Sequence, residues 1–138
     1  HEGGGDAADP GLRLFFSGDT GYFDGFAEIG RRFGPFDVTL METGAYDRRW
    51  QDVHMLPVQT LQAHLDLGGR SLLPIHNSTF DLAFHGWSEP METLYALARD
   101  AGVLVLYPEQ AQHANAQKCW NWFKPQDQRR GAGEQGRS

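Results

Sequence analysis

The sequence predicts an α/β fold, in which strands and helices alternate along the chain. Two observations carry this prediction. Short apolar runs that end at glycine or proline are typical of buried strands, and between them lie segments whose apolar residues recur at helical spacing. The alternation occurs four times, which implies a single sheet with helices packed on a face.

The order of elements follows from these runs. We expect strands at 14–17, 36–43, 71–75 and 103–107. Helical spacing is expected from Asp24 to Gly34-Pro35, from Pro57 to Gly68-Gly69, and from Ser88 to Gly102. His64 falls in the middle of the second helix beside a polar residue, so a surface position is expected for it.

Composition excludes several classes of protein. A length of 138 residues with 40% hydrophobic content fits one domain with a real core. A net charge of -6 argues against nucleic acid or an anionic membrane as the main partner. No run approaches the ~20 apolar residues of a transmembrane segment. The single cysteine, Cys119, excludes an internal disulfide and a cysteine-rich zinc cage, and a cytoplasmic location is the default.

Ligand-type residues follow the predicted strands. Asp19 lies in a Gly-Asp-Thr-Gly turn after the first apolar run, His76 directly follows the third, and His54 lies in the loop after the second. Open α/β sheets place ligands at the carboxyl ends of their strands. Carboxylate and imidazole groups suit zinc, so these three residues are candidate ligands, although three ligands do not fill two coordination spheres.

Four stretches, in this order, together carry a family resemblance. They are Phe-Phe-Ser-Gly-Asp-Thr-Gly-Tyr at 15–22, Ile-Gly-Arg-Arg-Phe-Gly-Pro-Phe-Asp at 29–37, Gly-Ala-Tyr at 44–46, and Pro-Ile-His-Asn-Ser-Thr-Phe at 74–80. From about Leu12 to Pro108 the chain resembles the metallo-β-lactamase fold family, in the branch similar to N-acylphosphatidylethanolamine-hydrolysing phospholipase D. The resemblance implies a four-layer αββα sandwich that binds two zinc ions, with a metal-bridging hydroxide that attacks a phosphodiester or a related ester.

The same resemblance suggests roles for individual residues. Asp19 matches the carboxylate that bridges both metals, and His76 matches the last histidine ligand of one metal. His54 matches a histidine near the metals that contacts substrate or relays protons, and is therefore the candidate catalytic residue. Tyr46, Arg49 and Trp50 match the loop beside the cleft, which makes them candidate substrate-binding residues.

One part of the family pattern is missing from these 138 residues. The first-half signature His-x-His-x-Asp-His is absent, as is the middle histidine ligand. We therefore expect residues 12–123 to form the C-terminal half of the domain, supplying only the C-terminal sheet and its helices. Residues 1–11 are expected to be a loop or frayed end, and residues 124–138 a disordered tail.

Two functional hypotheses follow. The first is a fragment of a zinc-dependent hydrolase, inactive alone, whose intact form cleaves a small-molecule or lipid ester, with a location in the cytoplasm or at the periphery of a membrane. The alternative is a non-catalytic remnant or interaction module that folds without metal. Half a sandwich leaves one sheet face unburied, so we expect either a homodimer or association with the missing N-terminal half.

Overall fold

The structure is a computed structural model, and it describes residues 11–77 and 83–108. Of these, residues 11–77 and 83–106 belong to one compact unit. Its elements, in chain order, are β1 (Leu14–Phe16), α1 (Gly25–Phe33), β2 (Phe36–Glu42), α2 (Pro57–Asp66), β3 (Gly69–Ile75), α3 (Glu89–Asp100) and β4 (Leu104–Val105).

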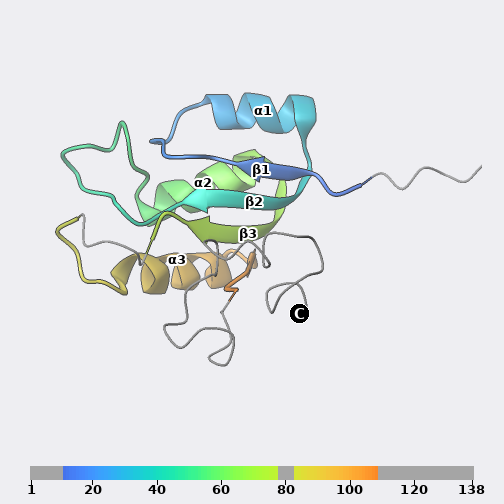
Figure 1. Cartoon of the computed structure of the whole chain (residues 1–138). Coiled ribbons are helices and arrows are strands. Elements are labelled where there is room, and N and C mark those ends of the chain that lie inside the picture. Colours follow the sequence, from blue (N-terminus) through green and yellow to red (C-terminus); the bar gives the residue numbers. More distant parts are fainter. Residues whose placement is uncertain (1–10, 78–82, 109–138) are drawn as a thin grey trace, which may run out of the picture. The chain divides into compact units, whose positions relative to one another are not determined.

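The four strands form one parallel sheet in the order β1-β2-β3-β4 (Figure 1). Each strand pairs with the next one in the chain, and a helix connects each pair. The register places Phe15, Thr39, Leu72 and Val105 in one row across the sheet. Because side chains alternate along a strand, this row faces one side and its neighbouring rows face the other.

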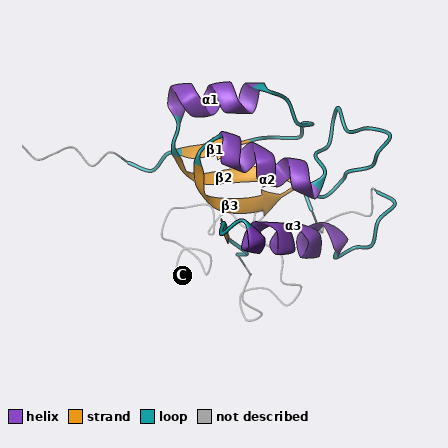
Figure 2. Ribbon diagram, turned by 180° about the vertical axis from the view of Figure 1, so that it is seen from behind, coloured by secondary structure: helices purple, strands orange, loops and turns teal. Residues whose placement is uncertain are grey.

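The helices cover the face of the sheet on which this row lies (Figure 2). Crossovers between parallel strands are right-handed, so three steps in one direction place three helices on the same side. One apolar core joins helix and strand residues, and it includes Phe26 from α1, Leu61 from α2, Leu94 from α3 and Leu72 from β3. The aromatic ring of Phe15 contacts Phe26 edge-on, at 6.0 Å between ring centroids.

The opposite face, here called the outer face, is apolar and partly exposed. It contains Leu14, Phe16 and Leu104, whose exposed fractions are 59%, 66% and 61%. The expectation that the first run is a buried strand was therefore wrong for two of its residues. Side chains alternate between the two faces along a strand. In this three-residue strand the middle residue, Phe15, therefore points toward the helices, and the two residues beside it point away.

The predicted α/β class is confirmed, and the sheet with its helix layer accounts for one sheet and one helix layer of the expected sandwich. β1 and β2 each end one residue earlier than expected, and the boundaries of β3 and β4 differ by more. β3 already begins at Gly69, where it pairs with Phe36, and β4 is limited to two residues that pair with Ser71 and Leu72. The loop expected at 1–11 lies almost wholly outside the described residues, and the tail expected at 124–138 entirely so. In the ranges that are described, no helix is both long and apolar enough to cross a bilayer.

The surface position expected for His64 is wrong. Its side chain is fully buried, and its Nδ1 lies 2.7 Å from the hydroxyl of Thr39 on β2. Gly69 on β3 makes the room, because a Cβ at that position would lie 2.4 Å from the same imidazole nitrogen. Burial disfavours the charged imidazolium and lowers the pKa of His64 to about 4.

Candidate metal and catalytic site

Three loops meet at the carboxyl ends of β1, β2 and β3. Asp19 lies in the loop after β1, His54 in the loop after β2, and His76 directly after β3. Neighbouring parallel strands end at the same edge of a sheet, so these three residues lie at the carboxyl edge, as the sequence predicts. His76 adopts a left-handed backbone conformation with φ of 59°, which is uncommon for a residue with a side chain.

The side chains of these residues form one cluster, here called the Asp-His-His cluster. A carboxylate oxygen of Asp19 lies 3.0 Å from His54 Nδ1 and 3.6 Å from His76 Nε2. The two imidazole rings stack at 5.3 Å between centroids with 17° between their planes. One ligand atom from each residue lies within 4.8 Å of the others, close enough for all three to contact one ion.

Two glycines let the loops approach each other so closely. A Cβ on Gly44, after β2, would lie 2.1 Å from the carbonyl oxygen of His76. A Cβ on Gly21, after β1, would lie 2.3 Å from the carbonyl oxygen of Gln51. In both places backbone packs directly against backbone, so the absence of a side chain sets the distance between neighbouring loops.

Glu42, the last residue of β2, lies behind the cluster. Its side chain is fully buried, and its Oε1 lies 2.8 Å from His54 Nδ1. The same oxygen accepts a hydrogen bond from the backbone N–H of Met55 at 3.1 Å. Sequence reasoning missed this residue. An acidic residue that directly follows the apolar pair Leu40-Met41 at the carboxyl end of a central strand was the signal that could have identified it.

Burial and charge act on both members of this pair. Burial raises the pKa of Glu42 to about 8; the hydrogen bond from Met55 opposes this shift, and the charge of Asp19 adds to it. The pKa of His54 is lowered, chiefly by burial and also by His76, while Asp19 opposes the shift. The cluster therefore favours a neutral imidazole, which is the form that binds metals and accepts protons.

The donor set of the cluster fits a zinc ion. One carboxylate and two imidazoles supply the three protein ligands that a catalytic zinc commonly has. Among the residues that the structure describes, this is the one group of three or more metal-ligating side chains that the geometry brings together. A second ion would need ligands from outside it.

The candidate substrate-binding residues lie in the loop between β2 and α2. Arg49 forms two hydrogen bonds with the carboxylate of Asp47, and its guanidinium lies over the rings of Trp50 and Phe84. Tyr46 stacks on His85 at 4.3 Å between ring centroids. Its hydroxyl donates to Glu89 at the start of α3, and burial together with this bond raises the pKa of Tyr46 to about 12.

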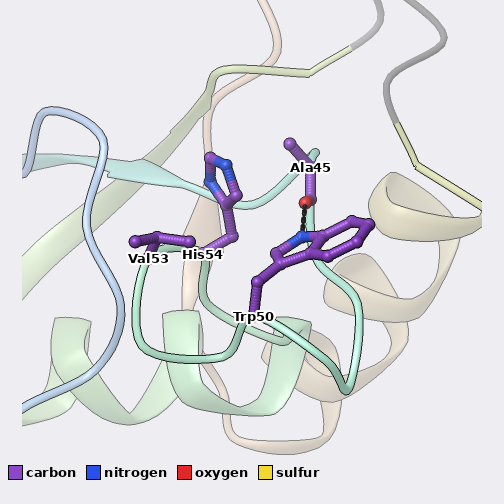
Figure 3. A pocket seen from close by; sticks show the side chains of 4 residues that line it. All are labelled: Ala45, Trp50, Val53 and His54. Atoms are coloured by element: carbon purple, nitrogen blue, oxygen red, sulfur yellow. Dashed lines mark hydrogen bonds between the residues drawn. The ribbon is translucent and has the colours of Figure 1, made fainter.

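Of these three residues, Trp50 lines a pocket together with His54 of the cluster. The pocket has a volume of about 140 Å³ and is lined by Ala45, Trp50, Val53 and His54 (Figure 3). The indole N–H donates to the carbonyl oxygen of Ala45 at 2.8 Å, which fixes the ring as one wall. A small apolar part of a bound molecule can fill this pocket between its apolar walls. A polar group of the same molecule can then contact the imidazole of His54.

Two models of known families match parts of the chain. The model of the Beta-lactamase superfamily domain matches residues 6–77, just over half of the chain. This stretch contains all three residues of the Asp-His-His cluster. A second model, Esterase PHB depolymerase, matches residues 91–137, of which the structure describes 91–108.

Individual proteins are also similar to the chain. An uncharacterized protein of Mycobacterium tuberculosis is 47% identical over 102 residues, covering 72% of this chain and 27% of that protein. The N-acyl-phosphatidylethanolamine-hydrolyzing phospholipase D 1 of Caenorhabditis elegans is 36% identical over 73 residues, covering 51% of this chain and 20% of that enzyme. The chain thus spans about a quarter of the length of these relatives, or less.

A solved structure shows a similar fold. Igni18, described as a novel metallo hydrolase from the hyperthermophilic archaeon Ignicoccus hospitalis, superposes with a TM-score of 0.50 at 25% identity. The match covers 68% of this chain and 37% of Igni18. The similarity therefore extends over most of this chain but a smaller part of the neighbour.

Proposed function

The chain belongs to the beta-lactamase superfamily, and from this we propose that residues 12–123 form the C-terminal half of a zinc-dependent hydrolase domain. The observation that supports this most directly is the Asp-His-His cluster at the carboxyl edge of the sheet. In this proposal the remaining ligands of a two-zinc site come from a longer protein, and the 138 residues alone have little activity.

Each residue of the cluster has a separate part in this proposal. Asp19 has two carboxylate oxygens and can bridge two ions, and His76 is a ligand of one of them. Zinc, when bound, supplies a Lewis acid that polarises the substrate and lowers the pKa of a water ligand. His54, held in a partly buried pocket as a neutral imidazole, contacts the substrate or accepts a proton from it.

The proposed substrate is a phosphodiester or another ester, including a lipid ester. The name of the Caenorhabditis elegans relative favours a phosphodiester of the N-acylphosphatidylethanolamine type. Trp50 lines the pocket beside His54 and is placed to contact the apolar part of such a substrate, whereas Arg49 is already paired with Asp47. Tyr46 and Arg49 then act by shaping the loop around the pocket. The proposal includes a cytoplasmic location, at the periphery of a membrane when the substrate is a lipid.

The direct test is the affinity of the chain for zinc. We expect calorimetric titration of the chelator-treated chain with zinc to show binding that becomes at least about tenfold weaker in Asp19→Ala, because the variant removes the only carboxylate of the cluster. Asp24→Ala is the matched control, since Asp24 is an exposed aspartate outside the cluster whose side chain makes no capping hydrogen bond. Equal affinities of the two variants would overturn the assignment of Asp19.

A second measurement addresses the substrate. A longer version of the protein that supplies the missing ligands is assayed, with zinc, on bis-nitrophenyl phosphate and on nitrophenyl acetate. Faster turnover of the phosphodiester supports the phospholipase-like proposal, and faster turnover of the acetate supports a carboxylic ester as the substrate. Loss of the favoured activity in Asp19→Ala is expected in either case.

The outer face of the sheet favours a second candidate function. Exposed apolar residues gather there on neighbouring strands, which is typical of a surface that another layer covers. A non-catalytic interaction module, present as a homodimer and folding without metal, would use this face. Zinc binding with the affinity difference described above favours the hydrolase, and its absence in a folded, associated chain favours the module.

A further inference from the structure

Glu42, behind the cluster, is held by hydrogen bonds from three directions. Its backbone N–H donates to the hydroxyl of Ser17 at 3.0 Å, and its carbonyl oxygen accepts from the hydroxyl of Thr60 at 2.8 Å. Its side-chain Oε1 accepts from the backbone N–H of Met55. This one residue is therefore held by the loop after β1, by α2 and by the loop before α2. A buried carboxyl group with these restraints has a defined position.

This fixed oxygen faces one nitrogen of His54. Nδ1 lies 2.8 Å from Glu42 Oε1, within ordinary hydrogen-bond distance. A neutral imidazole carries one proton, and the nitrogen that faces an acceptor is the one that carries it. The proton then resides on Nδ1, and Nε2 keeps its lone pair.

Asp19 competes for the same proton but is held differently. It lies 3.0 Å from Nδ1, and its side chain is 61% exposed, whereas Glu42 is fully buried. An exposed carboxylate is also the one that an incoming ion or substrate reaches. When Asp19 turns to such a ligand, Glu42 remains as the acceptor for Nδ1–H.

We propose that Glu42 is a positioning residue that holds His54 with its proton on Nδ1 and thereby leaves Nε2 as the nitrogen that accepts a proton. This inference rests on the proposed role of His54 in the hydrolase site. The ionised carboxylate of Glu42 accepts the Nδ1 proton directly, and a protonated carboxyl group does so when its proton is on Oε2, which leaves Oε1 as the acceptor. The N–H of Met55 directs that oxygen to the same place in either state.

The test is the tautomer of His54, read from long-range ¹H–¹⁵N correlations of the labelled full chain at pH 8 without metal. We expect the Nδ1–H tautomer in the wild type and in Asp19→Ala, where Glu42 alone can accept the proton. The double variant Asp19→Ala, Glu42→Met keeps the bulk of the side chain but removes the acceptor. It should lose the preference for Nδ1–H.

Two further variants separate positioning from a general structural effect. Glu42→Gln should retain the Nδ1–H tautomer, because Met55 N–H orients the amide oxygen toward the place of Oε1. Thr60→Val removes another buried hydrogen bond to Glu42, at its backbone, and should leave the tautomer unchanged. A shift in Thr60→Val as large as that in the Glu42→Met background would overturn the proposal.

The wild-type spectrum is decisive even if Glu42→Met does not fold. A proton on Nε2 of His54 in the wild-type chain contradicts the inference directly. Because the tautomer is read without metal, this outcome is independent of the zinc titration. The tautomer can therefore contradict the positioning role of Glu42 while the zinc titration supports the hydrolase proposal. The zinc titration can likewise contradict the hydrolase proposal while the tautomer is the expected one.

Discussion

At the scale of single residues, His64 shows how burial changes the behaviour of a common side chain. Its imidazole is enclosed between α2 and the sheet, with Thr39 as its hydrogen-bond partner, and its Nε2 has no partner among the residues that the structure describes. The folded chain resists protonation until about pH 4, whereas an unfolded chain takes up the proton near pH 6.5. Between these values the unfolded state binds more protons, so falling pH favours unfolding.

We expect this residue to make the protein acid-sensitive. As the pH falls from 7 to 4, the free energy of unfolding should decrease by about 3 kcal/mol through His64 alone. Urea denaturation at a series of pH values measures this, with His64→Leu as the variant that removes the titrating group. Thr39→Val is the matched control, because it removes the same hydrogen bond but keeps the imidazole, and its pH dependence should remain. An identical pH dependence in wild type and His64→Leu would contradict the account.

At the scale of elements, the contact between α1 and the end of α2 depends on one glycine. A Cβ on Gly30 would lie 2.1 Å from the carbonyl oxygen of Asp66, a backbone atom that cannot turn aside. The side chain of the same Asp66 accepts a hydrogen bond from Tyr22 at 2.6 Å, which ties the loop before α1 to the end of α2. The distance between α1 and the end of α2 is therefore one that only a residue without a side chain at position 30 allows.

The substitution Gly30→Ala therefore sets two effects against each other. Helix propensity alone predicts a gain of about 1 kcal/mol, while overpacking against backbone predicts a loss of about 1–3 kcal/mol. We expect the loss to dominate, so the midpoint of urea denaturation should fall. Arg31→Ala, at an exposed position on the same helix, should change the midpoint little. A more stable Gly30→Ala chain would show that α1 lies further from α2 than described.

Much of this level of structure can be predicted from sequence. Glycine and proline mark the ends of the helices, and the apolar spacing of α1, α2 and α3 gives their bounds to within about two residues. The faces of short strands cannot be predicted so well, as Leu14 and Phe16 show, because a three-residue run has no period to measure. The burial of His64 depends on Gly69 across a sheet-helix contact, and no local pattern contains that information.

The candidate site shows the same division. Asp19, His54 and His76 follow strands in the sequence, and a parallel sheet brings such positions to one edge. Their roles as ligands stay predictions. Glu42 was missed, because its contact with His54 forms only when the loop that carries His54 folds back over the end of β2.

At the scale of the whole molecule, the unequal faces of the sheet govern solution behaviour. Helices cover one face, while the outer face exposes Phe16 and its neighbours. We expect sedimentation velocity to show self-association that increases with concentration, and Phe16→Ser to weaken it. Phe33→Ser is the matched control, since Phe33 is exposed to a similar extent, 61% against 66%, but lies at the end of α1. Equal effects of the two variants would argue against the outer face as the contact.

The arrangement of the Asp-His-His cluster has a further consequence for folding. Its members come from three successive loops and are far apart along an unfolded chain. An ion bound to Asp19 and His76 acts as a cross-link that closes one long loop, and it binds only when the ends of β1 and β3 already lie on either side of β2. Added metal then behaves as a stabiliser of the parallel sheet itself, and the melting temperature becomes a readout of how many chains have assembled that edge.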